Sequence, residues 1–168
     1  NAIMGWTQLL QNGSLSAERW AHALDVIARN ARAQGQIVED LLDVSRITSN
    51  KLTLEVESVD LVTLVESVLD ASMLSVEAKG LRLARVLDTT ATPVLGDTAR
   101  LRQIVSNLLT NAVKFTPKGG SIRVSLARQS SDIELSVVDS GRGISPQFLP
   151  YVFEAFRQED PGMNRRSQ

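Results

Sequence analysis

The chain has 168 residues, a formal net charge of −1 and an apolar fraction of 43%. This length suits one ordinary domain, or a compact domain with a smaller helical appendage, and the apolar residues are sufficient to fill a core. The basic residues are scattered, so composition predicts no nucleic-acid partner. The lack of cysteine excludes a disulfide framework or a thiolate metal site and fits a reducing compartment.

No apolar stretch approaches the roughly 20 residues that span a bilayer. The longest, Leu61 to Val76, is interrupted by Glu66 and Asp70. The chain opens inside a helical pattern without a starting Met, so we expect an excised piece of a longer protein. We expect this piece to be soluble and cytoplasmic, with membrane attachment only through parts outside it.

Residues 1–50 predict two helices joined by a short turn. A first apolar stripe ends near Gly13, since glycine favours the left-handed conformation that ends helices. Ser16 is placed to cap the next helix. Along that helix, residues recur with alternating spacings of four and three, which is typical of the seam of a coiled coil or four-helix bundle. The seam positions are Trp20, Leu24, Ile27, Ala31, Gln34, Val38, Leu41 and Ser45.

Two helices joined by a short turn form an antiparallel helical hairpin. One hairpin alone cannot bury this seam and the apolar positions that flank it, whereas two hairpins can pair into a four-helix bundle. We therefore predict that residues 1–50 are the dimerisation domain of a homodimer. The alternative is that the seam packs on the second domain of its own chain, because heptads specify packing better than they specify a partner.

A second domain is expected over residues 51–168, because the pattern changes after residue 50. Leu52–Val56 alternates with a period of two, as strands do, and Asp60 is then placed to cap a helix. Residues 81–87 alternate again and predict a second strand, followed by a Thr/Pro loop.

Asp97 is placed to cap another helix. This helix must end by Thr116, because the residue before a proline is pushed out of the helical region. Ser121–Ala127 and Asp132–Asp139 then alternate as two strands of a hairpin. The predicted fold class is therefore α+β, with a helical hairpin followed by a mixed sheet on which helices are laid.

The helix after Asp97 carries the first informative set of residues. Asn107, Asn111 and Lys114 or Phe115 are spaced so that they share one face. This face offers two amides, which can coordinate a hard cation or bond phosphate oxygens, together with a cation and an aromatic ring. A ligand site explains this face, and an ordinary solvated polar face explains the spacing equally well.

A second set follows an apolar strand, as Asp139, Gly141 and Gly143. Glycines let the backbone approach a ligand closely, and a carboxylate can accept a hydrogen bond from the exocyclic amine of adenine. The pattern is not the dinucleotide fingerprint, because the third glycine and the following capped helix are missing. Taken alone, the pattern Asp-x-Gly-x-Gly also occurs in ordinary turns. The apolar rings of the later segment Tyr151–Phe156 are more typical of a core.

Taken in order, these elements resemble the sensor histidine kinases of two-component signalling, in the superfamily that also contains gyrase-type ATPases. Asn107–Phe115 resembles the N box of that family, Asp139–Gly143 its G1 box and Phe153–Phe156 its F box. Asp97–Gln103 resembles the start of the helix that carries the N box. Asn1–Gly5 resembles the stretch that follows the phosphoacceptor box, so the resemblance covers nearly the whole chain.

The resemblance implies an α/β-sandwich domain that binds ATP and Mg²⁺. It implies that Asn111 is a ligand of Mg²⁺ and that Asn107 supports the phosphate and metal network. Lys114 would neutralise phosphate charge, and Phe115 would lie against the adenine. It further implies that Asp139 accepts the adenine amine while Gly141 and Gly143 permit close approach.

The same resemblance implies a flexible lid that begins near Asp160. Phe153 and Phe156 would anchor the base of this lid, and Arg165 and Arg166 would reach the phosphates.

Two departures from the family pattern bear on activity. The phosphoacceptor histidine of the family lies before Asn1, and the single histidine, His22, is not at the acceptor position. The glycine-rich G2 box of the family is expected beyond Gln168. Asn107 stands where gyrase-type ATPases carry the glutamate that activates water, and an amide cannot act as a general base.

The activity that the resemblance implies is transfer of the γ-phosphoryl group of ATP to a histidine, and from there to an aspartate of a response-regulator receiver domain. Without the acceptor histidine, this chain is not expected to phosphorylate itself. Two other functions stay open: a degenerate kinase-like module that dimerises without catalysis, and an ATP hydrolase of the same superfamily.

Overall fold

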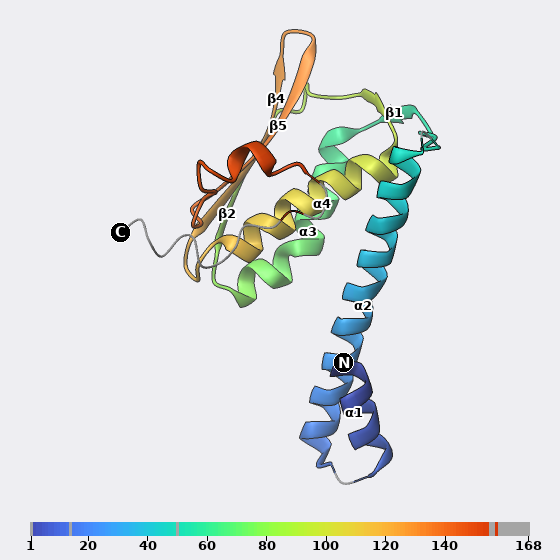
Figure 1. Cartoon of the computed structure of the whole chain (residues 1–168). Helices are drawn as coiled ribbons and strands as arrows, with labels where there is room; N and C mark the ends of the chain where they lie inside the picture. The colour runs from blue at the N-terminus through green and yellow to red at the C-terminus, as the bar shows by residue number, and fades with distance from the viewer. Residues whose placement is uncertain (1, 14, 50, 155–156, 158–168) are drawn as a thin grey trace. The chain divides into compact units, whose positions relative to one another are not determined.

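The computed structural model describes residues 2–13, 15–49, 51–154 and 157 (Figure 1). The chain divides into two compact units, residues 1–53 and 54–168. In the described part of both units, every helix is either too short or too polar to cross a membrane.

The first unit is the expected helical hairpin, formed by α1 (Ala2–Gln11) and α2 (Ala17–Thr48). The connection turns at Gly13, whose φ of 65° is the left-handed conformation that the sequence predicts. Ser16 occupies the N-cap of α2 in an extended conformation. The two helices pack together through the first part of α2, where Ala23 is fully buried.

The apolar face of α2 stays largely exposed along the rest of its length. Four side chains on it are between 50% and 65% exposed, namely Ile37, Val38, Leu41 and Leu42. Leu24, a seam position nearer the start of the helix, is 48% exposed. Contiguous exposed apolar residues of this kind mark interaction sites on soluble proteins.

The second unit alternates strands and helices. Its elements are β1 (Glu57–Val59), α3 (Leu61–Ala78), β2 (Arg82–Leu87), β3 (Val94–Gly96), α4 (Thr98–Phe115), β4 (Ser121–Gln129), β5 (Asp132–Asp139) and the 3₁₀ turn η1 (Leu149–Tyr151). The strand β4 pairs with β2 in parallel and with β5 antiparallel, while β1 pairs with β3 antiparallel. The predicted α+β class with a mixed sheet is confirmed.

Helices α3 and α4 lie side by side on one face of the β2–β4–β5 sheet (Figure 1). The alternation of β4 determines which face they cover, because Ile122, Val124 and Leu126 are each 1% exposed while Arg123 is exposed. These side chains join Leu64, Val65, Val68 and Leu69 of α3 and Val105, Leu109 and Ala112 of α4 in one core.

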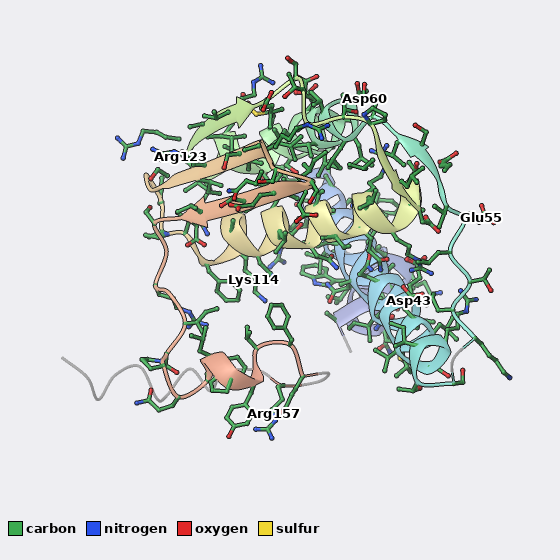
Figure 2. The ribbon with its side chains drawn as sticks, turned by 90° about the horizontal axis from the view of Figure 1, so that it is seen from above. Asp43, Glu55, Asp60, Lys114, Arg123 and Arg157 are labelled. Atoms are coloured by element: carbon green, nitrogen blue, oxygen red, sulfur yellow. The ribbon has the colours of Figure 1, made fainter. Side chains whose placement is uncertain are left out.

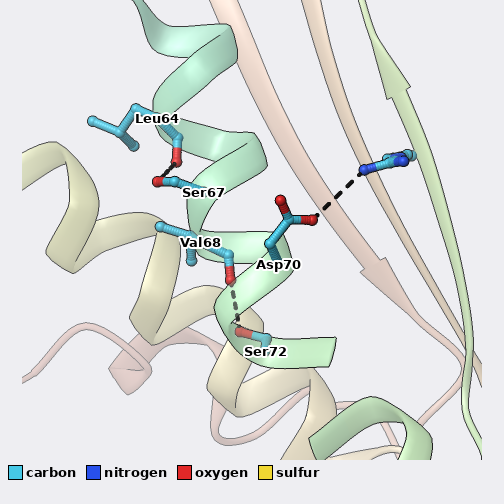
Figure 3. Close-up of polar contacts among 6 residues, drawn as sticks. Leu64, Ser67, Val68, Asp70 and Ser72 are labelled. Atoms are coloured by element: carbon cyan, nitrogen blue, oxygen red, sulfur yellow. Dashed lines mark hydrogen bonds and ion pairs between the residues drawn. The ribbon is translucent and has the colours of Figure 1, made fainter. Parts of the chain in front are cut away.

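Polar contacts join α3 to the edge of this sheet. The carboxylate of Asp70 lies 3.9 Å from the guanidinium of Arg85 on β2 (Figure 3). Along the helix, Ser67 and Ser72 donate their hydroxyls to backbone carbonyls one turn earlier, at 2.7 and 2.9 Å. Both partners of the ion pair are mostly exposed, so the apolar core supplies most of the stability of this layer.

Both predicted N-caps of this unit are confirmed. The carboxylate of Asp60 accepts a hydrogen bond from the Thr63 N–H, and that of Asp97 accepts one from the Arg100 N–H. At the other end, α4 stops at Phe115, as Pro117 requires.

The strand expected at Leu52–Val56 is not formed, and pairing begins only at Glu57. The partner strand explains this difference, because Glu57 pairs with Gly96 and the next residue, Asp97, already caps α4. No extended partner is therefore left for residues 52–56. The Glu55 N–H instead donates to the side chain of Asp97, at 3.0 Å.

Candidate functional site

The helix α4 positions the first set of candidate residues. Val105, Leu109 and Ala112 bury one side of the helix against the core, which leaves the other side open. Asn107, Asn111 and Lys114 are exposed on that open side. Figure 2 shows Lys114 on the side of α4 that faces the segment carrying η1.

The open side of α4 is not uniformly polar. Ile104 is 53% exposed, Leu108 is 42% exposed and Phe115 is 39% exposed. With Asn111 between them, these residues recur at spacings of three and four, so they form one stripe along the helix. An exposed stripe that mixes large apolar groups with an amide favours a ligand or a covering segment over a merely solvated face.

The second set of candidate residues lies where β5 ends. Asp139 pairs with Ile122 in the β4–β5 ladder, so its side chain lies on the face of the sheet that the helices cover. The backbone of Ser140 is tied to β4, because its N–H donates to the Ser121 carbonyl at 2.9 Å. One carboxylate oxygen of Asp139 accepts the Gly141 N–H at 2.7 Å, which holds the turn in place.

Gly141 brings the turn after β5 close to the end of α4. A Cβ atom at this position would lie 2.5 Å from the Asp139 carboxylate and 2.8 Å from the carbonyl oxygen of Phe115. Only a residue without a side chain permits this approach of the turn to the end of α4. Gly143 follows with a φ of 69°, another conformation that favours glycine. The turn after β5 therefore lies against the end of α4, although more than 20 residues of sequence separate the two.

Two cations lie close to the ring of Phe115 at this junction. The Nζ of Lys114 lies 5.0 Å from the ring centroid, and the Cζ of Arg142 lies 4.9 Å from it. The site therefore combines an exposed aromatic ring, positive charge and a carboxylate. Such a combination can hold a flat heterocycle that carries an exocyclic amine and an anionic group.

Sequence reasoning did not identify Lys79 as part of this region. Its Nζ donates to the carbonyl oxygens of Val113 and Lys114, at 2.6 and 2.9 Å. These carbonyls belong to the last turn of α4, so a cation from the end of α3 caps the helix that carries the site. The Lys79-Gly80 pair signals the end of its own helix, and nothing local in the sequence points to a partner more than 30 residues away.

Asp97 holds the start of the same helix. Hydrogen bonds from the Arg100 N–H and then from the Glu55 N–H stabilise its charged form and lower the pKa of its carboxyl from the ordinary value of 3.8. Both ends of α4 are thus held by side chains of opposite charge, in the orientation that the helix dipole favours.

The third set of candidate residues is described only in part. Phe153 follows η1 and is 100% exposed. Phe156 lies outside the described residues, as do Asp160, Arg165 and Arg166. In the first unit, His22 is exposed, and its ring lies edge-on to that of Trp6 with a centroid distance of 5.5 Å.

Two family models match the chain. Residues 1–50 match the His Kinase A (phospho-acceptor) domain, and residues 96–168 match the histidine kinase-, DNA gyrase B-, and HSP90-like ATPase family. The second match contains both sets of residues that meet at Gly141.

Known proteins resemble the chain across both units. Hybrid signal transduction histidine kinase L of Dictyostelium discoideum is 35% identical over 98% of this chain, which spans only 10% of that relative. The structure of ShkA in complex with AMPPNP is 28% identical and has a TM-score of 0.70, over 94% of this chain and 34% of that one. ThkA in complex with the response regulator TrrA shares the fold at 20% identity, with a TM-score of 0.70 over 93% of this chain and 46% of that one.

The two family matches follow one another along the chain, and the Dictyostelium kinase and ShkA match it over 98% and 94% of its length. The chain therefore belongs to the sensor histidine kinases, as a core that joins the dimerisation domain to the ATP-binding domain.

Proposed function

We propose that the second unit binds Mg-ATP at the junction of α4 with the turn after β5. The observation that carries this proposal is the close approach of Gly141 to the carbonyl oxygen of Phe115, since a Cβ atom there would lie only 2.8 Å away. The approach brings the turn that carries Asp139 against Phe115, whose side chain is 39% exposed. It is also the kind of backbone approach that nucleotide sites need.

The residues at this junction have the chemistry that the nucleotide requires. Phe115 offers a face for the adenine, and Asp139 keeps a second carboxylate oxygen besides the one that accepts the Gly141 N–H. That oxygen would accept the adenine amine. Lys114 would pair with phosphate. Gly143, which has no side chain, would let the backbone of the turn approach the nucleotide closely.

We propose Asn111 as the protein ligand of Mg²⁺ and Asn107 as a support of the phosphate network. The described residues contain no cluster of three or more histidine or carboxylate groups that would hold a metal alone. Mg²⁺ is commonly bound by few protein groups together with substrate phosphates, which fits exposed amides on a helix. When bound, the ion would neutralise charge on the transferred phosphoryl group.

For the intact protein, we propose transfer of the γ-phosphoryl group to a histidine and then to an aspartate of a response-regulator receiver domain. Family membership supports this proposal. Asn107 supports transfer over hydrolysis, because an amide cannot take a proton from water. Residues 1–50 would form the dimerisation domain and residues 51–168 the ATP-binding domain, with Phe153 and Phe156 at the base of the lid.

Photolabelling of the chain tests the location of the nucleotide. An ATP analogue with an azide at C8 of the adenine is expected to label peptides that contain Phe115 or residues 139–143. Excess unlabelled ATP should prevent this labelling, whereas GTP should not. Labelling elsewhere, or equal protection by GTP, would contradict the proposal.

A further inference from the structure

Arg142 stands between the two glycines of the turn after β5. Gly141 holds one side of the turn against the end of α4, and Gly143 has the left-handed backbone that completes it. The backbone at position 142 is therefore held near Phe115. The guanidinium of Arg142 lies 4.9 Å from the centroid of the Phe115 ring.

The guanidinium of Arg142 contacts the aromatic ring of Phe115. Within the described part of the chain, Arg142 forms no ion pair with a carboxylate, although its side chain is exposed. A planar guanidinium stacks on aromatic rings in much the same way as a planar base does. Arg142 and an adenine would therefore use the same surface of Phe115.

We propose that Arg142 determines nucleotide affinity by competing with the adenine for the ring of Phe115. The inference rests on the proposed function, because it takes the ring to be the platform for the base. Before the base can stack, the guanidinium must leave the ring. A cation on an exposed aromatic ring has a modest stability, so this competition weakens base binding by about two- to fivefold.

Lys114 does not replace Arg142 in this role. Its Nζ lies 5.0 Å from the same centroid, but an ammonium is a compact point charge that pairs readily with phosphate. Binding of a nucleotide would draw Lys114 away from the ring towards the phosphates. Arg142 has to be displaced by the base itself. It should therefore weaken the binding of nucleosides, which carry no phosphate, as strongly as the binding of nucleotides.

The test is calorimetric titration of the whole chain with adenosine and with a Mg²⁺-bound, non-hydrolysable ATP analogue. Adenosine carries no phosphate. Removing the charge of Arg142 therefore cannot weaken adenosine binding through a lost attraction to phosphate, which would mask the expected gain in affinity. Arg142→Ala is expected to bind adenosine about two- to fivefold more tightly than the unmutated chain. Arg142→Lys, which keeps the charge but loses the planar group that stacks, should return only part of the way to the original affinity.

Two further variants make the test specific. Arg123→Ala removes the same charge from the uncovered face of the sheet and should leave adenosine affinity unchanged (Figure 2). In a Phe115→Ala background, Arg142→Ala should produce no gain, because the shared surface is gone.

Weaker or unchanged binding by Arg142→Ala would overturn the inference, as would an equal gain in the Phe115→Ala background. If the unmutated chain binds neither adenosine nor the ATP analogue, the proposed function itself fails, which is a different result.

Discussion

The side-chain ammonium of Lys79 lies 2.6 Å from the carbonyl oxygen of Val113, and it also donates to the carbonyl of Lys114. This contact joins the end of α3 to the end of α4. It therefore fixes the turn of α4 from which Lys114 and Phe115 project.

Lys79→Met should lower the free energy of unfolding by about 1–3 kcal/mol, because charge-assisted hydrogen bonds to helix-terminal carbonyls are lost. Chemical denaturation measures this change. Lys118→Met is the matched control, since it removes an exposed lysine just beyond the end of α4. Equal stability of the two variants would show that the cap contributes nothing.

Gly141→Ala should disrupt the junction of the two sets of site residues. The added methyl would meet the Asp139 carboxylate and the backbone of Phe115, so the turn must move away from α4. We expect a destabilisation of about 1–3 kcal/mol, as for other overpacked sites, together with loss of nucleotide binding. The control is Gly5→Ala, because a Cβ atom there meets nothing within 4 Å. Unchanged binding by Gly141→Ala would show that the approach is not required.

Asp139→Asn separates recognition of the base from the geometry of the turn. An asparagine oxygen can still accept the Gly141 N–H, so the turn should survive. The remaining group would be an amide nitrogen, which cannot accept a hydrogen bond from adenine. Preference for ATP over GTP should fall by about 1–3 kcal/mol, measured by titration with both nucleotides. Equal binding of ATP and GTP by the unmutated chain would contradict this role for Asp139.

Stability should fall with acid because the helix N-caps carry carboxylates. Hydrogen bonds from the Thr63 hydroxyl and N–H lower the pKa of Asp60, and hydrogen bonds from the Arg100 and Glu55 N–H groups lower the pKa of Asp97, both from 3.8. A lowered pKa in the folded state gives stability that is present above the unfolded value and is lost as the pH falls through the folded value. Thermal unfolding measured from about pH 6 to about pH 2, a range that spans the ordinary pKa of aspartate, shows how much stability is lost.

The Asp97→Asn variant tests the origin of this pH dependence. Asparagine is also a good N-cap but does not titrate, so the variant should keep its helix and lose less stability in acid. An unaltered pH dependence would assign the acid sensitivity to other groups.

Leu41→Glu should dissociate the dimer proposed for the helical hairpin. Leu41 is 54% exposed on the apolar face of α2, and a charge buried there would oppose association. Analytical ultracentrifugation measures the mass. Leu95→Glu is the matched control, because Leu95 is 82% exposed in the other unit. If the Leu41→Glu variant has the same mass in solution as the unmutated chain, this face does not form the dimer.

Local signals in the sequence predicted much of this fold. Asp60 and Asp97 could be predicted as N-caps because each is a short carboxylate side chain directly before an apolar helical pattern. The end of α4 could be predicted because the clash between Pro117 and the residue before it is purely local. The sequence also singled out the amides of α4 and the carboxylate and glycines of the turn after β5 as candidate site residues, and their role in binding stays a prediction.

Local patterns in the sequence could not predict the long-range contacts. The strand pairing of β1 with β3 involves only three residues on each side, and it left Leu52–Val56 without a partner despite a clear alternation. Lys79 and Arg142 act through contacts with residues about 30 positions away, which neither charge nor periodicity reveals. Tertiary packing determined these features.

The most direct test of the nucleotide site is calorimetric titration of this chain with a non-hydrolysable ATP analogue, with and without Mg²⁺. We predict binding that strengthens when Mg²⁺ is present, and loss of that dependence in Asn111→Asp with the fold intact. Absence of binding under both conditions, or equal binding with and without the metal, would contradict the account.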